Sequence, residues 1–407
     1  MPAIQNFNYT NHMKKEKKDK LTIAIVTNNY TPYSGGVVSS INTFVDELHK
    51  KGHKAFIITL DFLGKEHSDP YYVIRIPSIT RFLYKKNIMA IPWGPTKKLM
   101  DIIKILKPDI IHTQHPFFLG KSALTVARKL DIPIVFTYHT IYEQYAHYVP
   151  TPEIISRPII KKIVLAFCKK VDGIICPSNY IKHFLHAKNI QTKIEKIPSG
   201  ILPLFIKPKN TNPQKGFFNL LTVSRFVKEK NIPFLLKLFA KLYHTNATKQ
   251  HLPQFTFTLI GYGAEYEKLK KYAYKKLKIP QDTLEFICQP NKTTISDTYY
   301  QSDLFLFSST TDTQGLVLAE AMAGGCPIVA IDGPGQRDIV VDGFNGFLCQ
   351  SEDQMIEKII SIAKNKELHD GLTDNALQTG RQYHPALMTQ RLIKLYHDVL
   401  EQQGHLR

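Results

Sequence analysis

Short runs of apolar residues alternate with amphipathic stretches along most of this chain. The runs lack the every-second-residue polarity of a half-exposed strand, which is typical of parallel strands buried on both faces. Between them, apolar residues recur at the spacing of one helix face, as at Ile41, Val45 and Leu48. This alternation predicts an α/β fold with doubly wound parallel sheets. The predicted strands are Leu21–Thr27, Ala55–Leu60, Ile110–His112, Ile134–Thr137, Gly173–Cys176, Phe218–Val223, Phe255–Ile260, Leu284–Ile287, Leu304–Phe307 and Ile328–Ala330.

The stretch Pro203–Gly216 interrupts this alternation and is polar and rich in proline and lysine. It is the predicted linker between two Rossmann-like domains, at residues 21–205 and 206–385, and a basic, disordered tail is expected at residues 1–20. A chain of 407 residues with 43% hydrophobic content can bury two cores of ordinary size. We expect a cleft at the carboxyl ends of both sheets, where α/β proteins bind their ligands.

Positive charge is concentrated in the first half of the chain. Residues 1–200 contain 29 Lys and Arg against 14 Asp and Glu, within a total net charge of +19. Nucleic acid, anionic lipid and a merely solvated basic surface all explain such an asymmetry. The sequence has no zinc-finger, RRM or homeodomain-like spacing, so a nucleic-acid partner is not expected.

Membrane spans and metal centres are also not expected. No apolar run is long enough to cross a bilayer, and residues 1–20 lack the apolar core of a signal peptide, which predicts a soluble or peripheral cytoplasmic protein. The five cysteines are widely spaced, without a CxxC pair or a Cys/His cluster, and are predicted to be buried free thiols. They are Cys168, Cys176, Cys288, Cys326 and Cys349.

The segment 308–331 carries the most specific chemical pattern. Asp312 and Glu320 lie eight residues apart around Gly315, directly after an apolar strand and at the start of a helical pattern. Helix N-termini attract phosphate, and a carboxylate one turn into the helix can accept hydrogen bonds from two ribose hydroxyls. This arrangement predicts a nucleotide-sugar site. The alternative is an ordinary strand–helix turn in which Asp312 caps the helix and Glu320 is solvated.

The same segment, DTQGLVLAEAMAGGCP at residues 312–327, resembles the acid-x7-Glu signature of the retaining family 4 glycosyltransferases. That family normally has Glu at the first acidic position, so Asp312 shortens the reach of the carboxylate by one methylene. Further segments resemble the motifs of this family in the same order, and several ordered motifs are far more specific than one. They are residues 29–41, 137–150, 197–201, 224–231 and 259–265.

The resemblance implies a GT-B fold, in which the first domain binds the acceptor and the second binds the nucleotide sugar. It implies that residues 386–407 form a helix that packs back on the first domain. Catalytic candidates are His139, as a positioning residue rather than a base, with Arg225 and Lys230 on the donor diphosphate and Asp312 on the sugar. No cofactor and no strict metal requirement are expected. Further donor-site candidates are Gly35, Gly36, Gly261, Gly263, Thr313, Gln314, Gly315, Leu316 and Glu320.

Taken without the motifs, these residues have ordinary structural explanations. Lys and Arg in loops are usually solvent-exposed, paired glycines usually form tight turns, and a histidine at a strand end is most often structural. The resemblance therefore supplies the assignment, and the residues themselves leave both explanations open.

Two segments bear on the acceptor. Residues 138–148, YHTIYEQYAHY, resemble bacterial glycosyltransferases that glucosylate diacylglycerol, as does the Thr313–Gly315 tripeptide, and Tyr142 and Tyr145 are candidate acceptor contacts. The segment could equally pack in a core. Arg81–Lys98 interleaves aromatic residues, including Trp93, with the cations Arg81, Lys85 and Lys86, which favours a position in the membrane interface. The alternative is a loop that covers the first domain.

The sequence thus predicts a retaining glycosyltransferase on the inner face of the membrane that moves a hexose from UDP-glucose to a lipid hydroxyl such as that of diacylglycerol. Its predicted partners are a nucleotide sugar, the lipid acceptor and an anionic membrane surface. Phosphatidylinositol, a polysaccharide or a lipopolysaccharide core remain alternative acceptors. A non-catalytic basic binding module and an epimerase that releases free sugar are the other hypotheses.

Overall fold

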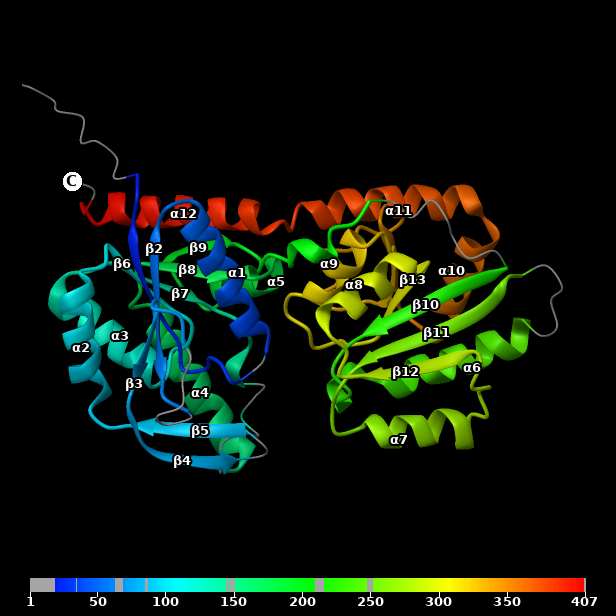
Figure 1. The fold of residues 1–407 in the computed structure, drawn as a ribbon, viewed down its shortest axis with the longest axis horizontal. Coiled ribbons are helices and arrows are strands. Elements are labelled where there is room, and N and C mark those ends of the chain that lie inside the picture. Colours follow the sequence, from blue (N-terminus) through cyan, green and yellow to red (C-terminus); the bar gives the residue numbers. More distant parts are fainter. Residues whose placement is uncertain are drawn as a thin grey trace, which may run out of the picture.

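The computed structural model describes residues 19–405 except for residues 34, 63–68, 85–86, 144–145, 147–150, 209–215 and 247–251. Its backbone forms two parallel sheets of seven and six strands, each covered by helices on both faces, and the two lie side by side in Figure 1. The apolar runs of the sequence form the central strands, which are buried almost completely. The predicted α/β fold class is therefore confirmed.

The first sheet has the strand order β3-β2-β1-β6-β7-β8-β9. In its parallel register, Ile23 of β1 lies between Ala55 of β2 and Ile110 of β6. Its strands are β1 (Thr22–Val26), β2 (Lys54–Leu60), β3 (Val73–Ile76), β6 (Ile110–Thr113), β7 (Ile134–Thr137), β8 (Gly173–Cys176) and β9 (Lys193–Lys196). The helices between them are α1 (Gly36–Lys50), α2 (Pro95–Leu106), α3 (Leu119–Leu130), α4 (Glu153–Cys168) and α5 (Asn179–His186).

The second sheet has the order β12-β11-β10-β13-β14-β15. Its strands are β10 (Phe217–Val223), β11 (Gln254–Gly261), β12 (Leu284–Cys288), β13 (Leu304–Phe307), β14 (Ile328–Ile331) and β15 (Gly346–Cys349). The helices of this half are α6 (Ile232–Asn246), α7 (Tyr266–Lys271), α8 (Lys292–Gln301), α9 (Leu316–Ala323), α10 (Glu352–Lys364) and α11 (Lys366–Arg381). The short turns η2 (Pro203–Phe205) and η3 (Lys228–Lys230) and the π-helical turn η4 (Tyr272–Lys276) complete the described secondary structure.

Both sheets reverse their strand order at one place, between β1 and β6 in the first and between β10 and β13 in the second. At such a switch point the connections leave in opposite directions, so the loops after the two strands separate and make room for a ligand. The chemistry of this protein is therefore expected in the loops after β1, β6, β10 and β13.

The last helix, α12 (Pro385–Gln402), runs from the second domain across the first, along the top of Figure 1. Its apolar face joins the core between α1 and the first sheet through Leu392, Tyr396 and Val399. The Tyr396 hydroxyl lies 2.7 Å from Nδ1 of the buried His112 in β6. The end of the chain thus contributes to the core of the first half.

The segment Arg81–Lys98 does not form one continuous amphipathic element. It folds into the antiparallel hairpin of β4 (Ser78–Tyr84) and β5 (Asn87–Pro92), followed by α2. Arg81, predicted to face lipid, donates instead to the carboxylate of Asp61, whereas Trp93 is 70% exposed. The predicted lipid contacts Lys85 and Lys86 lie outside the described residues.

Two other expectations from the sequence meet different outcomes. Cys288 is exposed, because it ends the edge strand β12, so the prediction that all five thiols are buried was wrong. The other four cysteines are buried, and all five are free. Among the described residues, no helix has both the length and the hydropathy needed to span a bilayer.

Candidate active site

The loops after β10 and β13 bring Lys230 and Asp312 together. Lys230 Nζ lies 2.6 Å from both carboxylate oxygens of Asp312, and both side chains are largely shielded from solvent. The N-cap of α9 is Gly315, whose left-handed φ of 63° favours glycine, so Asp312 does not cap that helix. This geometry excludes the capping alternative considered for Asp312.

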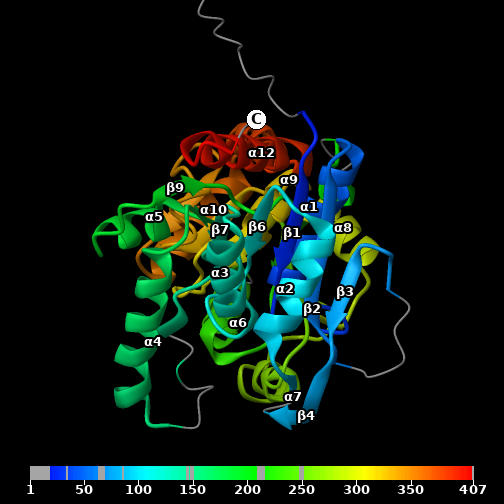
Figure 2. The same ribbon diagram turned by 90° about the vertical axis from the view of Figure 1, so that its left-hand side faces the viewer.

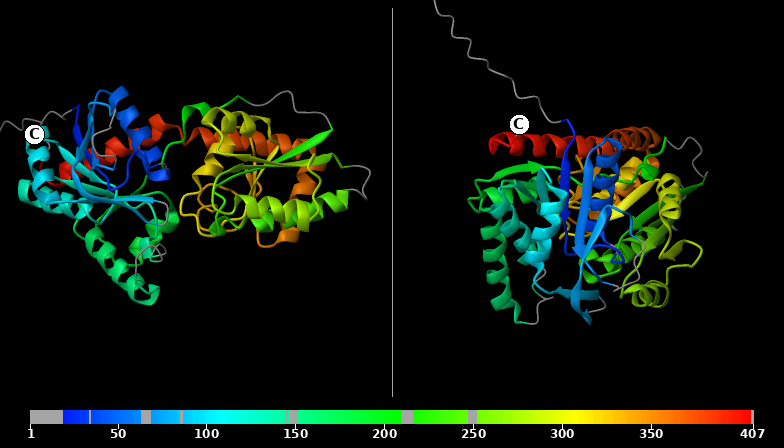
Figure 3. Two further views of the ribbon diagram at one scale, coloured as in Figure 1. Left: turned by 60° about the horizontal axis from the view of Figure 1, so that its bottom comes forward. Right: turned by 60° about the vertical axis from the view of Figure 1, so that its left-hand side comes forward.

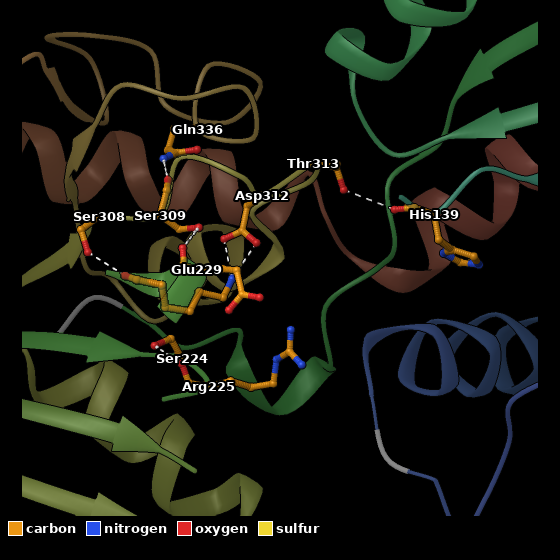
Figure 4. Close-up of polar contacts among 10 residues, drawn as sticks. His139, Ser224, Arg225, Glu229, Ser308, Ser309, Asp312, Thr313 and Gln336 are labelled. Atoms are coloured by element: carbon orange, nitrogen blue, oxygen red, sulfur yellow. Dashed lines mark hydrogen bonds and ion pairs between the residues drawn. The ribbon is translucent and has the colours of Figure 1, made fainter. Parts of the chain in front are cut away.

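Three side chains hold these two loops in place (Figure 4). Ser308, directly after β13, donates its hydroxyl to the carbonyls of Lys230 and Asn231 at 2.9 and 3.1 Å, and Ser309 donates to the carbonyl of Glu229 at 3.1 Å. The fully buried Gln336 donates its amide N–H groups to the carbonyls of Ser309 and Ile331. Because the bonds end on backbone carbonyls, they fix the position of Lys230 whatever its side chain binds. The sequence analysis missed Gln336, which no local pattern marks.

Gly261 and Gly263 are required by the close packing of two backbone segments, which the sequence did not reveal. A Cβ on Gly261 would lie 1.8 Å from the carbonyl oxygen of Ser224, and one on Gly263 would lie 2.3 Å from that of Phe226. The two glycines therefore let the loop after β11 lie directly against the loop that carries Arg225. The exposed guanidinium of Arg225 extends from this loop on the side of the first domain (Figure 4). No ion pair to it is found among the described residues.

Glu320 lies in the middle of α9 and is partly buried. The hydroxyl of the fully buried Tyr299 donates to its Oε2 at 3.2 Å. Burial raises the pKa of Glu320 to about 7, against the lowering effect of the Tyr299 hydrogen bond and of Lys292. Because burial disfavours ionisation of Glu320, hydrogen-bond donors such as two vicinal hydroxyls would stabilise its carboxylate strongly.

In the first domain, a neutral polar cluster occupies the ends of β6 and β7. His139 Nε2 lies 2.8 Å from Oε1 of the buried Gln114. Burial lowers the pKa of His139 to about 3 and that of its neighbour His115 to about 4. Since the Gln114 oxygen can only accept, it requires the proton of neutral His139 to be on Nε2 and leaves Nδ1 as an acceptor. The sequence analysis missed Gln114 and His115, although both directly follow a strand at the switch point.

The loop between Asp312 and α9 bridges the two domains. Thr313 donates its hydroxyl to the carbonyl of His139 at 3.3 Å, as Figure 4 shows. Gln314 donates to the carbonyl of Ser199 at 3.4 Å, and the Ser199 hydroxyl reaches Ser40 of α1 at 2.9 Å. The predicted residues Thr313 and Gln314 thus place the Asp312 loop beside His139.

The remaining predicted site residues lie at helix starts, in the core of the first domain or outside the described residues. Gly35 and Gly36 are the N-cap and first residue of α1, whose start has no side-chain cap, and Leu316 is the first residue of α9. Tyr142, predicted as an acceptor contact, is buried in the first core against Phe136 and Tyr138, and its hydroxyl has no partner among the described residues. The core-packing alternative therefore holds for Tyr142, because its ring fills space between β7 and its neighbours. Tyr145 lies outside the described residues.

Within the described ranges, no three His, Cys, Asp or Glu side chains are grouped so that they could hold a metal ion. The site as described consists of two cations, two carboxylates and a neutral histidine cluster.

Comparison with protein-family models matches the two halves of the chain separately. Residues 34–203 match the model described as Glycosyltransferase Family 4, and residues 205–379 match Glycosyl transferases group 1. Among characterised proteins, the chain is similar to the alpha-monoglucosyldiacylglycerol synthase of Streptococcus pneumoniae, with 33% identity over 84% of this chain and 78% of that protein. It is also similar to the synthase of the same name from Acholeplasma laidlawii, with 30% identity over 94% of this chain and 98% of the relative.

Solved structures share the architecture at lower sequence identity. The pneumococcal O-GlcNAc transferase GtfA superimposes with a TM-score of 0.71 and 16% identity, over 94% of this chain and 99% of that one. Anabaena Alr3699/HepE superimposes with a TM-score of 0.72 and 16% identity, over 93% and 100%. The two parallel-sheet domains therefore form a GT-B fold.

Proposed function

Because this chain belongs to family 4 of the glycosyltransferases, we propose that it transfers glucose from UDP-glucose to the free hydroxyl of diacylglycerol and retains the configuration at the anomeric carbon. The acceptor is suggested by the two relatives named alpha-monoglucosyldiacylglycerol synthase, which match most of the chain. The reaction takes place at the inner membrane surface, where a diacylglycerol acceptor is available.

The observation that supports this proposal is the Thr313 hydrogen bond, which joins the loop of the Lys230–Asp312 pair to the backbone of His139. The Thr313 hydroxyl joins the loop of Asp312 to the backbone of His139, so a charged donor site and a neutral acceptor site meet at one bridge. A transferase needs this arrangement, because the anomeric carbon of the bound donor must lie within reach of the acceptor hydroxyl.

The cations serve the leaving group. Lys230 Nζ has three N–H donors and uses two of them on Asp312, which leaves one for a phosphate oxygen. Arg225 adds a planar fork that can bind the diphosphate with two hydrogen bonds. Charge that develops on the diphosphate as the glycosidic bond breaks is stabilised by these preorganised donors, and no metal is required for that step.

The carboxylates hold the sugar and the ribose. Glu320 accepts from the two ribose hydroxyls, and Asp312, held by Lys230, accepts from hydroxyls of the transferred hexose. One methylene shorter than Glu, Asp312 keeps its position because both of its oxygens are bound by the same ammonium group.

His139 positions the acceptor and does not remove its proton. A conjugate-acid pKa of about 3 makes the imidazole a poor base near neutral pH. The acceptor hydroxyl attacks from the face that the diphosphate leaves, and the departing phosphate oxygen takes its proton. The Nδ1 lone pair of His139 accepts a hydrogen bond from a substrate hydroxyl and fixes its direction.

A transfer assay tests the proposal. Purified protein is incubated with labelled UDP-glucose, UDP-galactose, UDP-N-acetylglucosamine or GDP-mannose, each with diacylglycerol in vesicles, with phosphatidylinositol, with an oligosaccharide, or without acceptor. The expected result is one glucosylated lipid, formed from UDP-glucose and diacylglycerol, whose anomeric proton has the small coupling constant of an α-glucoside. Free sugar released without any acceptor would contradict the proposal, as would transfer to the oligosaccharide alone.

A further inference from the structure

Helix α4 has two apolar faces. Its inner face packs Val164, Phe167 and Cys168 into the core of the first domain. Its outer face carries Ile154, Ile155, Ile159 and Ile163, which are between 47% and 84% exposed. A helix that covers a sheet is ordinarily polar on its outer face, so four exposed isoleucines on one helix need another explanation.

The outer isoleucines form one stripe. Ile155, Ile159 and Ile163 follow each other at intervals of four residues and therefore lie above one another on the helix surface. Ile154 lies about 100° further round the helix from Ile155 and adds an exposed apolar side chain at the first turn. The helix begins at Glu153, with Pro158 in its interior, and this start places Ile154 and Ile155 on the helix.

Basic residues surround this stripe. Arg157, Lys161 and Lys162 lie on α4, and the exposed Lys169 and Lys170 follow its last turn. The one acidic residue of the helix, Glu153, is paired with Arg157. An apolar helix face bordered by cations complements an anionic lipid surface, in which isoleucine enters the acyl region while the ammonium groups remain among the headgroups.

The position of α4 agrees with this chemistry. In Figures 1 and 2 the lower end of α4 and the β4–β5 hairpin lie at the same end of the first domain, and Figure 3 shows α4 projecting from the body of that domain. The strands of the first sheet also end on this side, where the acceptor is expected. The hairpin and the residue after it expose Ile79, Ile91 and Trp93.

We propose that the outer face of α4, together with the β4–β5 hairpin, docks this protein on an anionic bilayer. This inference rests on the proposed function, since a diacylglycerol acceptor remains in the bilayer and the enzyme must reach it there. A second copy of the chain is a poorer occupant of the stripe, because a twofold contact would bring the cations of two α4 helices together.

The test measures vesicle binding without any substrate. The triple variant Ile155→Ser, Ile159→Ser, Ile163→Ser is compared with the matched triple Ile105→Ser, Val341→Ser, Leu387→Ser, which removes three exposed apolar side chains from other elements. Flotation with phosphatidylglycerol–phosphatidylcholine vesicles is expected to show a dissociation constant raised about tenfold or more for the α4 triple, because acyl contacts scale with buried apolar carbon. The matched triple should bind like the wild type, and thermal unfolding monitors the fold of both.

A second measurement needs no substitution. Trp93 is the single tryptophan of the chain, so a blue shift of its emission, and quenching by brominated lipid, reports insertion of the hairpin end. Wild-type binding by the α4 triple would overturn the inference, as would a wild-type protein that binds vesicles without anionic lipid equally well. Loss of a wild-type dimer in the α4 triple, seen by light scattering, would overturn it in favour of a second copy.

Failure of this inference differs from failure of the proposed function. If the protein docks through α4 but glucosylates no lipid, the docking surface stands and the acceptor assignment falls. If it glucosylates diacylglycerol in detergent micelles while the α4 triple still binds vesicles normally, the docking surface falls and the reaction stands.

Discussion

The loops at the carboxyl end of the second sheet carry charge, whereas the same end of the first sheet carries neutral side chains that are buried or partly buried. Lys230, Asp312 and Glu320 come from the second sheet, while Gln114 and His139 come from the first. Both groups lie at or next to the place where the strand order reverses, with Gln114 after β6 and His139 after the neighbouring β7, so topology alone does not distinguish them. Under the proposed function, the second sheet binds the anionic diphosphate and the first sheet binds the uncharged hydroxyl.

The largest expected effect concerns Glu320 on the charged side. Glu320→Ala removes the carboxylate that is proposed to accept from the ribose hydroxyls, and we expect transfer to fall below detection and donor affinity to weaken. Steady-state kinetics and calorimetric titration with UDP measure both effects. The control Glu357→Ala removes an exposed carboxylate from α10 and should change neither. Near-normal activity of Glu320→Ala would remove the residue from the site.

The next effect concerns the cations. Arg225→Ala should reduce turnover by about 100-fold or more, because one preorganised charge at a developing anion contributes about 3 kcal/mol. Lys230→Ala should lose at least as much, since it also leaves Asp312 without its partner. Lys228→Ala, an exposed cation on the same turn, is the matched control. Equal losses of turnover in all three variants would show that the rate depends on the overall positive charge of the loop and not on the positions of Arg225 and Lys230.

Asp312 tests whether the shorter acid takes part in the reaction. Asp312→Asn keeps the shape but removes the charge that holds Lys230, and we expect turnover to fall by roughly tenfold or more. Asp312→Glu restores the acid usual in the family and should keep or raise the rate. Full activity of Asp312→Asn, measured at saturating donor, would show that the carboxylate serves only the loop.

A smaller effect is expected on the neutral side. Gln114→Glu places a carboxylate against His139, which should raise the pKa of the imidazole from about 3 and add an acidic limb to the pH–rate profile. In the wild type, His139 stays neutral from pH 5 to pH 9 and contributes no such limb. Gln191→Glu, at an exposed position of the same domain, controls for the added charge. An unchanged profile in Gln114→Glu would show that the Gln114 contact does not tune His139.

The smallest effect is on stability. The folded protein raises the pKa of Glu320 to about 7 from 4.5, so it disfavours the carboxylate, and stability is lost as pH rises through this interval. Glu320→Gln removes this loss while keeping an acceptor for Tyr299. At pH 8 the variant should therefore have a free energy of unfolding at most about 3 kcal/mol larger than the wild type and a higher unfolding temperature, with little difference in either at pH 4. A variant that is less stable at pH 8 would contradict the assigned cause.

The sequence by itself determined ten of the strands and the order of the motifs, whereas the strands β3, β4, β5, β9 and β15 were not predicted. Fully buried parallel strands require continuous apolar runs, and these can be recognised without any contact information, as at β13 and β14. The Asp312–Glu320 segment could also be recognised from the sequence alone, because the loop and helix residues of one strand–helix unit are neighbours in sequence.

Only the tertiary structure decided which side chains meet. Lys230 and Asp312 are 82 residues apart, and Gln114 and His139 are 25 apart on neighbouring strands, so each contact depends on strand register and loop path. The buried position of Gln336 and the exposed outer face of α4 could not be predicted from the sequence either. An amide or an isoleucine has the same local pattern whether it is buried or exposed, and only the packing of neighbouring elements settles which face of a helix is covered.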